Sequence, residues 1–230
     1  TRTAQSPFDV PASIDRIGGE FIRDAKPQVN ISESLGGVPG LLARDRQNYA
    51  QDVQISVRGF GARSTFGIRG VRLYVDGIPA TLPDGQGQIT NVDLGTADRI
   101  EVLRGPFSAL YGNSSGGVIQ VFTEEGVGPP AVGAGAFVGS YGARRFGVKA
   151  SGANGGFGYV VGASAFGIDG YREHSAAERY IGNSKLTWRE GDDFLTMIVN
   201  HVDLRAQDPL GLTRDKFESD PTSADPAATQ

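Results

Sequence analysis

The fold is decided by residues 99–123, R-I-E-V-L-R-G-P-F-S-A-L-Y-G-N-S-S-G-G-V-I-Q-V-F-T. Apolar and charged residues alternate through Ile100, Val102 and Arg104, which is typical of a half-buried strand. Gly105-Pro106 ends that strand, and a proline in this position favours the first turn of a helix. A glycine-rich loop then leads into a second strand at 118–123. The stretch therefore predicts strand, tight turn, one helical turn, glycine loop and strand.

Two strands are predicted upstream of this stretch, at 53–57 and 71–75, and the two within it have their apolar centres at 100–103 and 119–122. Asp76-Gly77 is a turn signal after the second of them. Asn30 followed by Glu33 fits a capping box, which predicts a short helix there. Two long polar loops, 59–70 and 79–91, separate the strands. The first 125 residues thus predict a small α+β domain with a mixed β-sheet.

Beyond residue 125 the character of the sequence changes. Glu124–Pro130 has the composition of a linker, and five segments of about ten residues follow, at 131–139, 144–152, 157–166, 180–189 and 194–204. Several of them alternate: Phe146 and Val148 face one way while Arg145 and Lys149 face the other. Short and long connections alternate too, as in outer-membrane β-barrels. A complete large barrel needs several hundred residues, so we expect only its first antiparallel strands in this chain.

Bulk composition excludes several classes of function. The 230 residues include no cysteine, which rules out disulfides, thiolate metal sites and cysteine nucleophiles. The net charge of −4 offers no basic field for nucleic acid. The only histidines, His174 and His201, lack a third partner at metal-ligand spacing, so no metal site is predicted.

One motif in the sequence matches the nucleophile motif of serine hydrolases. Gly112–Gly116 matches the G-x-S-x-G pattern at Ser114, and Asp169, His201 and Asp203 follow it along the chain. That pattern needs a strand before the serine and a helix after it, whereas here the order is reversed. We therefore predict a glycine-rich loop at this place and no catalytic residue.

Residues 99–123 resemble the signature of the plug domain of TonB-dependent outer-membrane receptors, R-I-E-V-x-R-G-P-x-S-x-L-Y-G-x-x-x-x-G-G-V-I. Val53–Gly61 is similar to the family's I-x-I-R-G-F segment, and Val71–Pro79 to its strand ending in D-G-x-P. Residues 58–88 and 208–214 look closest to a subgroup that contains the pyrroloquinoline-quinone receptor. The resemblance implies a plug domain at 1–125, a linker at 126–130 and the N-terminal part of an outer-membrane β-barrel at 131–230.

The resemblance also implies a function and a set of site residues. The protein would be a non-enzymatic receptor that takes up a scarce extracellular solute, such as a ferric siderophore, pyrroloquinoline quinone or cobalamin, across the outer membrane without a resident cofactor. Arg58 and Arg104 are expected between plug and barrel wall, where arginine binds carboxylates bidentately. The ligand-contacting residues are expected in the apical plug loops: Phe60, Arg63, Phe66, Arg69, Asp84, Gln86 and Gln88.

The implied partners are TonB with ExbB-ExbD, the extracellular solute and outer-membrane lipid. The family meets TonB through a short N-terminal box by strand addition, and Thr1–Ser6 holds at most the last residues of such a box. We therefore expect a processed or truncated N-terminus. One alternative stays open, a soluble plug-like binding or signalling module without a pore.

Overall fold

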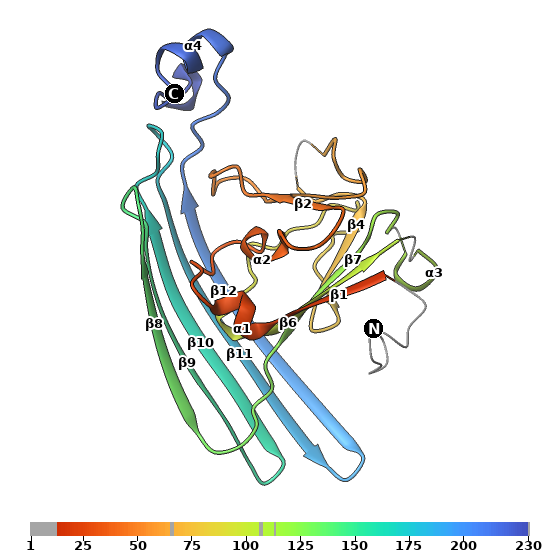
Figure 1. Ribbon diagram of the computed structural model, residues 1–230. Coiled ribbons are helices and arrows are strands. Elements are labelled where there is room, and N and C mark those ends of the chain that lie inside the picture. Colours follow the sequence, from red (N-terminus) through yellow and green to blue (C-terminus); the bar gives the residue numbers. More distant parts are fainter. Residues whose placement is uncertain (1–12, 65–66, 106–107, 113, 230) are drawn as a thin grey trace. The chain divides into compact units, whose positions relative to one another are not determined.

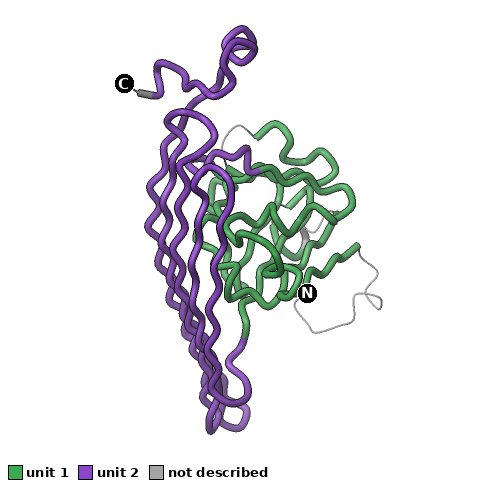
Figure 2. Tube along the Cα trace, turned by 60° about the vertical axis from the view of Figure 1, so that its left-hand side comes forward, with its two compact units in different colours: residues 1–44, 52–124 green, residues 45–51, 125–230 purple. Residues whose placement is uncertain are grey.

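The structure, a computed structural model, describes residues 13–64, 67–105, 108–112 and 114–229. The chain divides into two compact units, shown in different colours in Figure 2. The first unit comprises residues 1–44 and 52–124, and the second comprises residues 45–51 and 125–230. A seven-residue segment in the middle of the first unit's sequence therefore belongs, by its contacts, to the second.

A five-stranded mixed sheet forms the centre of the first unit (Figure 1). Its strand order is β1-β6-β7-β4-β5; β4 runs parallel to β7 and the other neighbours are antiparallel. The bounds are β1 Ser13–Gly18, β4 Val71–Val75, β5 Ile78–Pro79, β6 Ala97–Arg104 and β7 Gly117–Thr123. A separate antiparallel pair joins β2, Leu41–Arg44, to β3, Gln54–Val57. The mixed sheet predicted from the sequence is confirmed.

The two central strands are sealed from solvent. On β6 and β7, Ile100 lies opposite Val121 and Val102 opposite Ile119, and all four side chains are 0% exposed. Burying side chains of this size contributes about 1.5–3 kcal/mol each, so this layer holds the unit together. The core is completed by residues of the short helices, Ile22 of α1 (Gly19–Arg23), Leu35 of α2 (Ser32–Leu35) and Leu94 of η1 (Leu94–Thr96).

The capping box predicted at residues 30–33 is only half formed. The Glu33 carboxylate accepts hydrogen bonds from the backbone N–H groups of Gln28, Val29 and Asn30, at 2.7, 2.9 and 2.7 Å. The residue before the helix is Ile31, however, and it gives no side-chain cap. Glu33 therefore fixes the chain's entry into α2 through three backbone contacts.

The Asp76-Gly77 signal is a tight hairpin turn between β4 and β5. Both residues have positive φ, 48° and 81°, as a type I′ turn requires. The Asp76 carboxylate also accepts from the backbone N–H of Thr123 at 2.9 Å and from its hydroxyl at 2.5 Å. The turn is thereby tied to the end of β7.

Residues 99–123 contain the predicted elements in the predicted order, with β6, α3 (Ser108–Tyr111) and β7. Pro106 and Phe107, which the sequence places in the turn after β6, lie outside the described residues. Gly117 begins β7 with φ +141°, and a Cβ built there would lie 2.3 Å from the carbonyl oxygen of Leu103. The glycine loop is thus needed where β7 starts against β6.

The second unit is one antiparallel sheet in which each strand pairs with the next along the chain (Figure 1). Its strands are β8 Ala131–Val138, β9 Arg144–Asn154, β10 Phe157–Ile168, β11 Ala177–Glu190 and β12 Asp193–Ala206. The five predicted segments are confirmed, although β11 and β12 reach 14 residues each. Two-residue turns, Gly155-Gly156 and Gly191-Asp192, join β9 to β10 and β11 to β12. The short helices α4 (Arg214–Ser219) and η2 (Pro226–Thr229) follow β12.

One face of this sheet carries exposed apolar side chains. Phe146 and Val148 on β9 are 56% and 43% exposed, as the alternation in the sequence predicts. Trp188 on β11 and Met197 on β12 are 40% and 55% exposed. Such a row of large apolar groups is unusual for a surface that faces water.

None of the helices formed by the described residues has the length and apolar character needed to cross a membrane.

We predict that Gly117→Ala destabilises the first unit by about 2 kcal/mol or more, because the new Cβ meets backbone and the residue must keep a positive φ. Gly36→Ala is the matched control, since Gly36 has φ −62° and nothing lies within 4 Å of its ideal Cβ. Urea unfolding of the two variants measures the difference. Equal midpoints would contradict the steric argument.

Candidate functional site

The two long loops of the first unit are joined by their backbones. Ile68 and Gly87 exchange hydrogen bonds, at 3.1 Å from the Ile68 N–H and 2.7 Å from the Gly87 N–H. Thr81 pairs with Gly87 as well, and the Ile68 side chain is fully buried. The loops 59–70 and 79–91 are therefore one surface with a fixed geometry rather than two independent turns.

Three of the predicted ligand residues come together on this surface. Nη2 of Arg69 lies 3.3 Å from Asp84 Oδ2 and 3.3 Å from Gln86 Oε1, and its Nη1 donates to the Asp84 carbonyl at 3.2 Å. The side chains of Arg69 and Asp84 are 47% and 55% exposed. An exposed pair of this kind adds little stability. The guanidinium of Arg69 faces solvent, and its contacts with Asp84 and Gln86 favour one orientation of the group.

Three further predicted ligand residues lie on the surface of the first unit. Phe60 is 50% exposed, and Arg63 and Gln88 are exposed as well. Phe66 lies outside the described residues. Ligand contact for all seven residues stays a prediction.

The two arginines expected at the barrel wall differ in their surroundings. Arg58 has φ +49°, its backbone N–H donates to Gly40 O at 2.8 Å, and its side chain is exposed. Arg104 is engaged inside the first unit, where Nε donates to Asp15 Oδ2 at 2.7 Å and Nη1 to the Pro39 carbonyl at 2.9 Å. Wall contact stays a prediction for both, and Arg104 has a partner that the sequence did not reveal.

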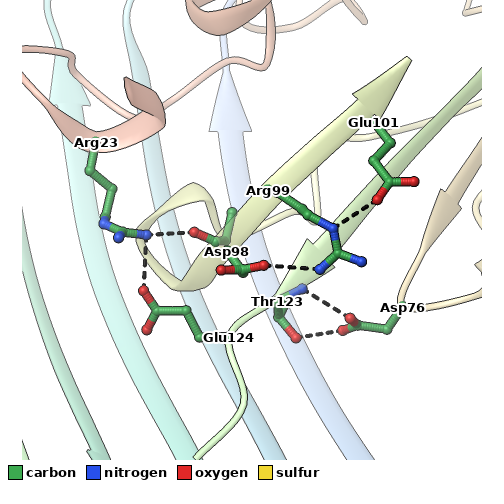
Figure 3. A network of polar contacts seen from close by, with 8 residues as sticks. Arg23, Asp76, Asp98, Arg99, Glu101, Thr123 and Glu124 are labelled. Atoms are coloured by element: carbon green, nitrogen blue, oxygen red, sulfur yellow. Dashed lines mark hydrogen bonds and ion pairs between the residues drawn. The ribbon is translucent and has the colours of Figure 1, made fainter. Parts of the chain in front are cut away.

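A charged cluster around the start of β6 and the end of β7 was missed from the sequence (Figure 3). Arg99 donates to Glu101 at 2.8 Å and to Asp98 at 2.9 Å, and its guanidinium lies 3.8 Å from the centre of the Phe122 ring. Arg23 on α1 pairs with Glu124 at 3.0 Å and also donates to the carbonyl of Ala97. The local part of this cluster has a sequence signal, because Asp98, Arg99 and Glu101 lie close together along the chain. The ion pair of Arg23 with Glu124 has none, because tertiary packing brings α1 to the end of β7.

The hydrolase candidate gains no support from the first unit. The Ser114 hydroxyl is buried and donates to the Gly112 carbonyl at 3.1 Å. Both histidines of the chain belong to the second unit. Among the described residues, no group of three or more histidine, aspartate or glutamate side chains could hold a metal ion.

Comparison with known proteins assigns the first unit to a family. The model of the TonB-dependent Receptor Plug Domain matches residues 6–118. The chain carries a TonB-dependent receptor plug domain. The five-stranded mixed sheet and its paired loops are thus the plug fold, and the resemblance seen in residues 99–123 is confirmed.

Relatives of the plug domain include iron receptors. The chain is 28% identical over 138 residues to the ferric enterobactin receptor of Pseudomonas aeruginosa, covering 54% of this chain and 18% of that protein. It is 33% identical over 131 residues to the iron-regulated outer membrane virulence protein of Vibrio cholerae, covering 53% of this chain and 19% of that protein. The chain therefore spans about a fifth of the length of these relatives.

Solved structures extend the likeness of fold beyond the plug domain. The pyoverdine outer membrane receptor FpvA of Pseudomonas aeruginosa matches 86% of this chain with a TM-score of 0.72 at 21% identity, and the match covers 28% of that receptor. The ferric-catecholate import receptor Fiu of Escherichia coli matches 87% of this chain with a TM-score of 0.69 at 21% identity, covering 28% of that receptor. The fold class predicted from the sequence, a plug domain followed by antiparallel strands, is confirmed.

We predict that Arg104→Ala costs the plug domain about 1.5–3 kcal/mol of unfolding free energy, because it leaves the Asp15 carboxylate without its charged donor. The two side chains are only 14% and 27% exposed. Arg69→Ala is the control, since the exposed pair with Asp84 contributes well under about 1 kcal/mol. Urea midpoints of the two variants test this, and a larger loss in Arg69→Ala would refute the ranking.

Proposed function

We propose that this chain is the plug domain and the first barrel strands of a receptor that moves a scarce solute across the outer membrane of a Gram-negative bacterium. The supporting observation is the plug-family match over residues 6–118. We assign residues 1–125 to the plug, 126–130 to a linker and 131–230 to the start of the barrel. In this reading the plug closes the pore until energy from TonB, ExbB and ExbD moves it.

The exposed apolar row of the second unit supports a place in lipid. In an outer-membrane strand, alternate residues face the hydrocarbon, with aromatic groups near the interfaces. Phe146 and Val148 on β9 fit the lipid face, and Trp188 near the end of β11 fits an interface position. A soluble plug-like module would expose these apolar side chains to water, which is unfavourable, so this alternative ranks second.

Ferric siderophores are the solutes we favour. Two ferric enterobactin receptors of Pseudomonas aeruginosa and the ferrienterobactin receptor of Escherichia coli are among the relatives, at 28–29% identity. A vitamin B12 transporter of Vibrio vulnificus is another, at 28% identity. Cobalamin and pyrroloquinoline quinone therefore remain comparison ligands.

The surface formed by loops 59–70 and 79–91 has chemistry that suits such a solute. Phe60 offers stacking area, and Arg63 and Arg69 offer donors to an anionic chelate. The contacts of Arg69 with Asp84 and Gln86 hold its guanidinium in one orientation, which lowers the ordering cost of binding. Capture and release of a solute need no covalent step, so we assign no enzymatic activity.

The decisive experiment measures binding and uptake by the complete protein that carries this chain, produced in the outer membrane. Radiolabelled ferric enterobactin, cobalamin and pyrroloquinoline quinone are offered to cells with and without TonB. We expect TonB-dependent uptake of the ferric chelate. A protein that stays in solution without detergent and gives no uptake would support the soluble module instead.

Arg69→Ala is expected to weaken binding of the accumulated solute by about tenfold, because one charged hydrogen-bond donor is lost. Arg214→Ala is the matched control, since Arg214 is an exposed arginine paired only with Glu218 of the same helix in the contacts described. Binding isotherms on whole cells measure both variants. Equal weakening in the two would remove Arg69 from the binding surface.

Arg58→Ala and Arg104→Ala are expected to alter uptake more than surface binding, because both residues are proposed to lie between plug and barrel wall. Initial uptake rates at saturating solute separate the two steps. Parental uptake in both variants would contradict the proposed position.

A further inference from the structure

The segment 45–51, which joins β2 to β3, is held by one carboxylate far along the chain. Nδ2 of Asn48 donates to Asp208 Oδ1 at 2.8 Å, and Nε2 of Gln51 donates to Asp208 Oδ2 at 2.8 Å. Each carboxylate oxygen thus receives one amide donor from the segment. Asp208 follows the end of β12, within the same compact unit as residues 45–51.

The segment is shaped to present these two amides. The Asn48 side-chain oxygen accepts from the Ala50 N–H at 3.0 Å, while Asp45 Oδ1 accepts from the Gln47 N–H at 3.0 Å. Arg46 and Gln47 have φ of 56° and 52°. A left-handed conformation at two consecutive non-glycine residues costs about 1–2 kcal/mol each, so contacts outside the segment must hold it in this form.

The backbone next to the carboxylate is held by an arginine. Arg172 donates to the carbonyls of Pro209, Leu210 and Ser223, at 3.2, 2.7 and 3.0 Å. The Leu210 N–H in turn donates to Asp208 Oδ1 at 3.0 Å. Arg172 therefore holds the chain that positions Asp208.

A second contact is made by Tyr49, which lies between the two amides in sequence. The rings of Tyr49 and Phe166 on β10 have centroids 5.1 Å apart at an interplanar angle of 48°. Next to the carboxylate, the segment, the loop around Tyr171 and residues 208–211 enclose a cavity of about 290 Å³. The segment is thus held at two points beside a cavity.

We propose that Asp208 is a latch that holds the β2–β3 connection of the plug and opens when the plug moves. The proposal rests on the proposed function, because a plug that admits solute must rearrange its strands, and β2 and β3 flank this segment directly. While Asp208 keeps both amides, the segment stays with the second unit. Releasing them frees the connection to follow the plug.

The first test is hydrogen exchange of the complete protein in detergent, which requires no transport. Asp208→Ala should speed exchange at the amides of residues 47–50 by about tenfold, because two charged hydrogen bonds are lost. Asp215→Asn, a charge change on exposed α4, is the control and should leave the segment unchanged. Parental exchange in Asp208→Ala would overturn the latch.

Protonation gives a second test. Burial raises the pKa of Asp208, but hydrogen bonds from Gln51, the Leu210 amide and Asn48, with the charge of Arg172, outweigh it and hold the pKa below its ordinary value of 3.8. The contribution of a carboxylate with a depressed pKa is present above that ordinary value and is lost as pH falls through the depressed one. Arg46 and Arg172 are the cationic residues that line the cavity.

A nitroxide attached through Gln47→Cys reports this change, because the chain has no other cysteine. We expect a constant, restricted spectrum from pH 7 down to the ordinary carboxyl range, and a more mobile one as the pH falls below that range through the depressed pKa of Asp208. The same label in Asp208→Asn should be mobile at every pH. A pH response that persists in Asp208→Asn would assign the effect to another group and contradict the proposal.

A cross-link separates the latch from transport itself. Asn48→Cys with Asp208→Cys can be joined by a short bis-thiosulfonate reagent, because the native side chains meet at their tips at 2.8 Å and a direct disulfide would need closer Cβ atoms. The cross-linked receptor should bind solute and fail to take it up, and a reductant should restore uptake. Failure of the reagent to join the two thiols would refute the contact, and normal uptake by the cross-linked protein would refute the opening step. Absence of uptake even in the parent without the two introduced cysteines would instead refute the proposed function, while the exchange and spin-label data still test the latch.

Discussion

Sealing of β7 between β6 and β4 is the constraint on which the rest of the plug depends. All but one of its residues from Gly117 to Thr123 are buried, so both faces must be covered and both edges paired. The parallel partner β4 lies on one edge and the antiparallel partner β6 on the other. Loops that leave these strands emerge from fixed points, which gives the candidate ligand surface a rigid base.

Much of this could be predicted because the signal is local. The alternation of Ile100, Val102 and Arg104 marks β6, and Asp76-Gly77 marks the hairpin turn whose two positive φ values the structure shows. The long segments of the second unit were predictable for the same reason, since a period of two is visible in several of them. Residues 99–123 also match the signature of the plug-domain family closely enough to identify the plug from the sequence alone.

The features that escaped prediction are those joined across long stretches of sequence. Arg104 pairs with Asp15, 89 residues away, and Asn48 pairs with Asp208, 160 residues away. Single side chains of this kind look like ordinary polar loop residues until tertiary structure brings them together. The sequence of residues 40–60 does not reveal that segment 45–51 packs with the second unit, because the residues that this segment contacts lie beyond residue 165.

The second unit's sheet has a physical consequence for handling the protein. Its outermost strands, β8 and β12, each pair on one side only within the described residues. A long flat strand with free N–H and C=O groups beside apolar side chains is a template for pairing with another copy. These two edges therefore favour edge-to-edge association of the chain in water, so detergent is needed to handle it in solution.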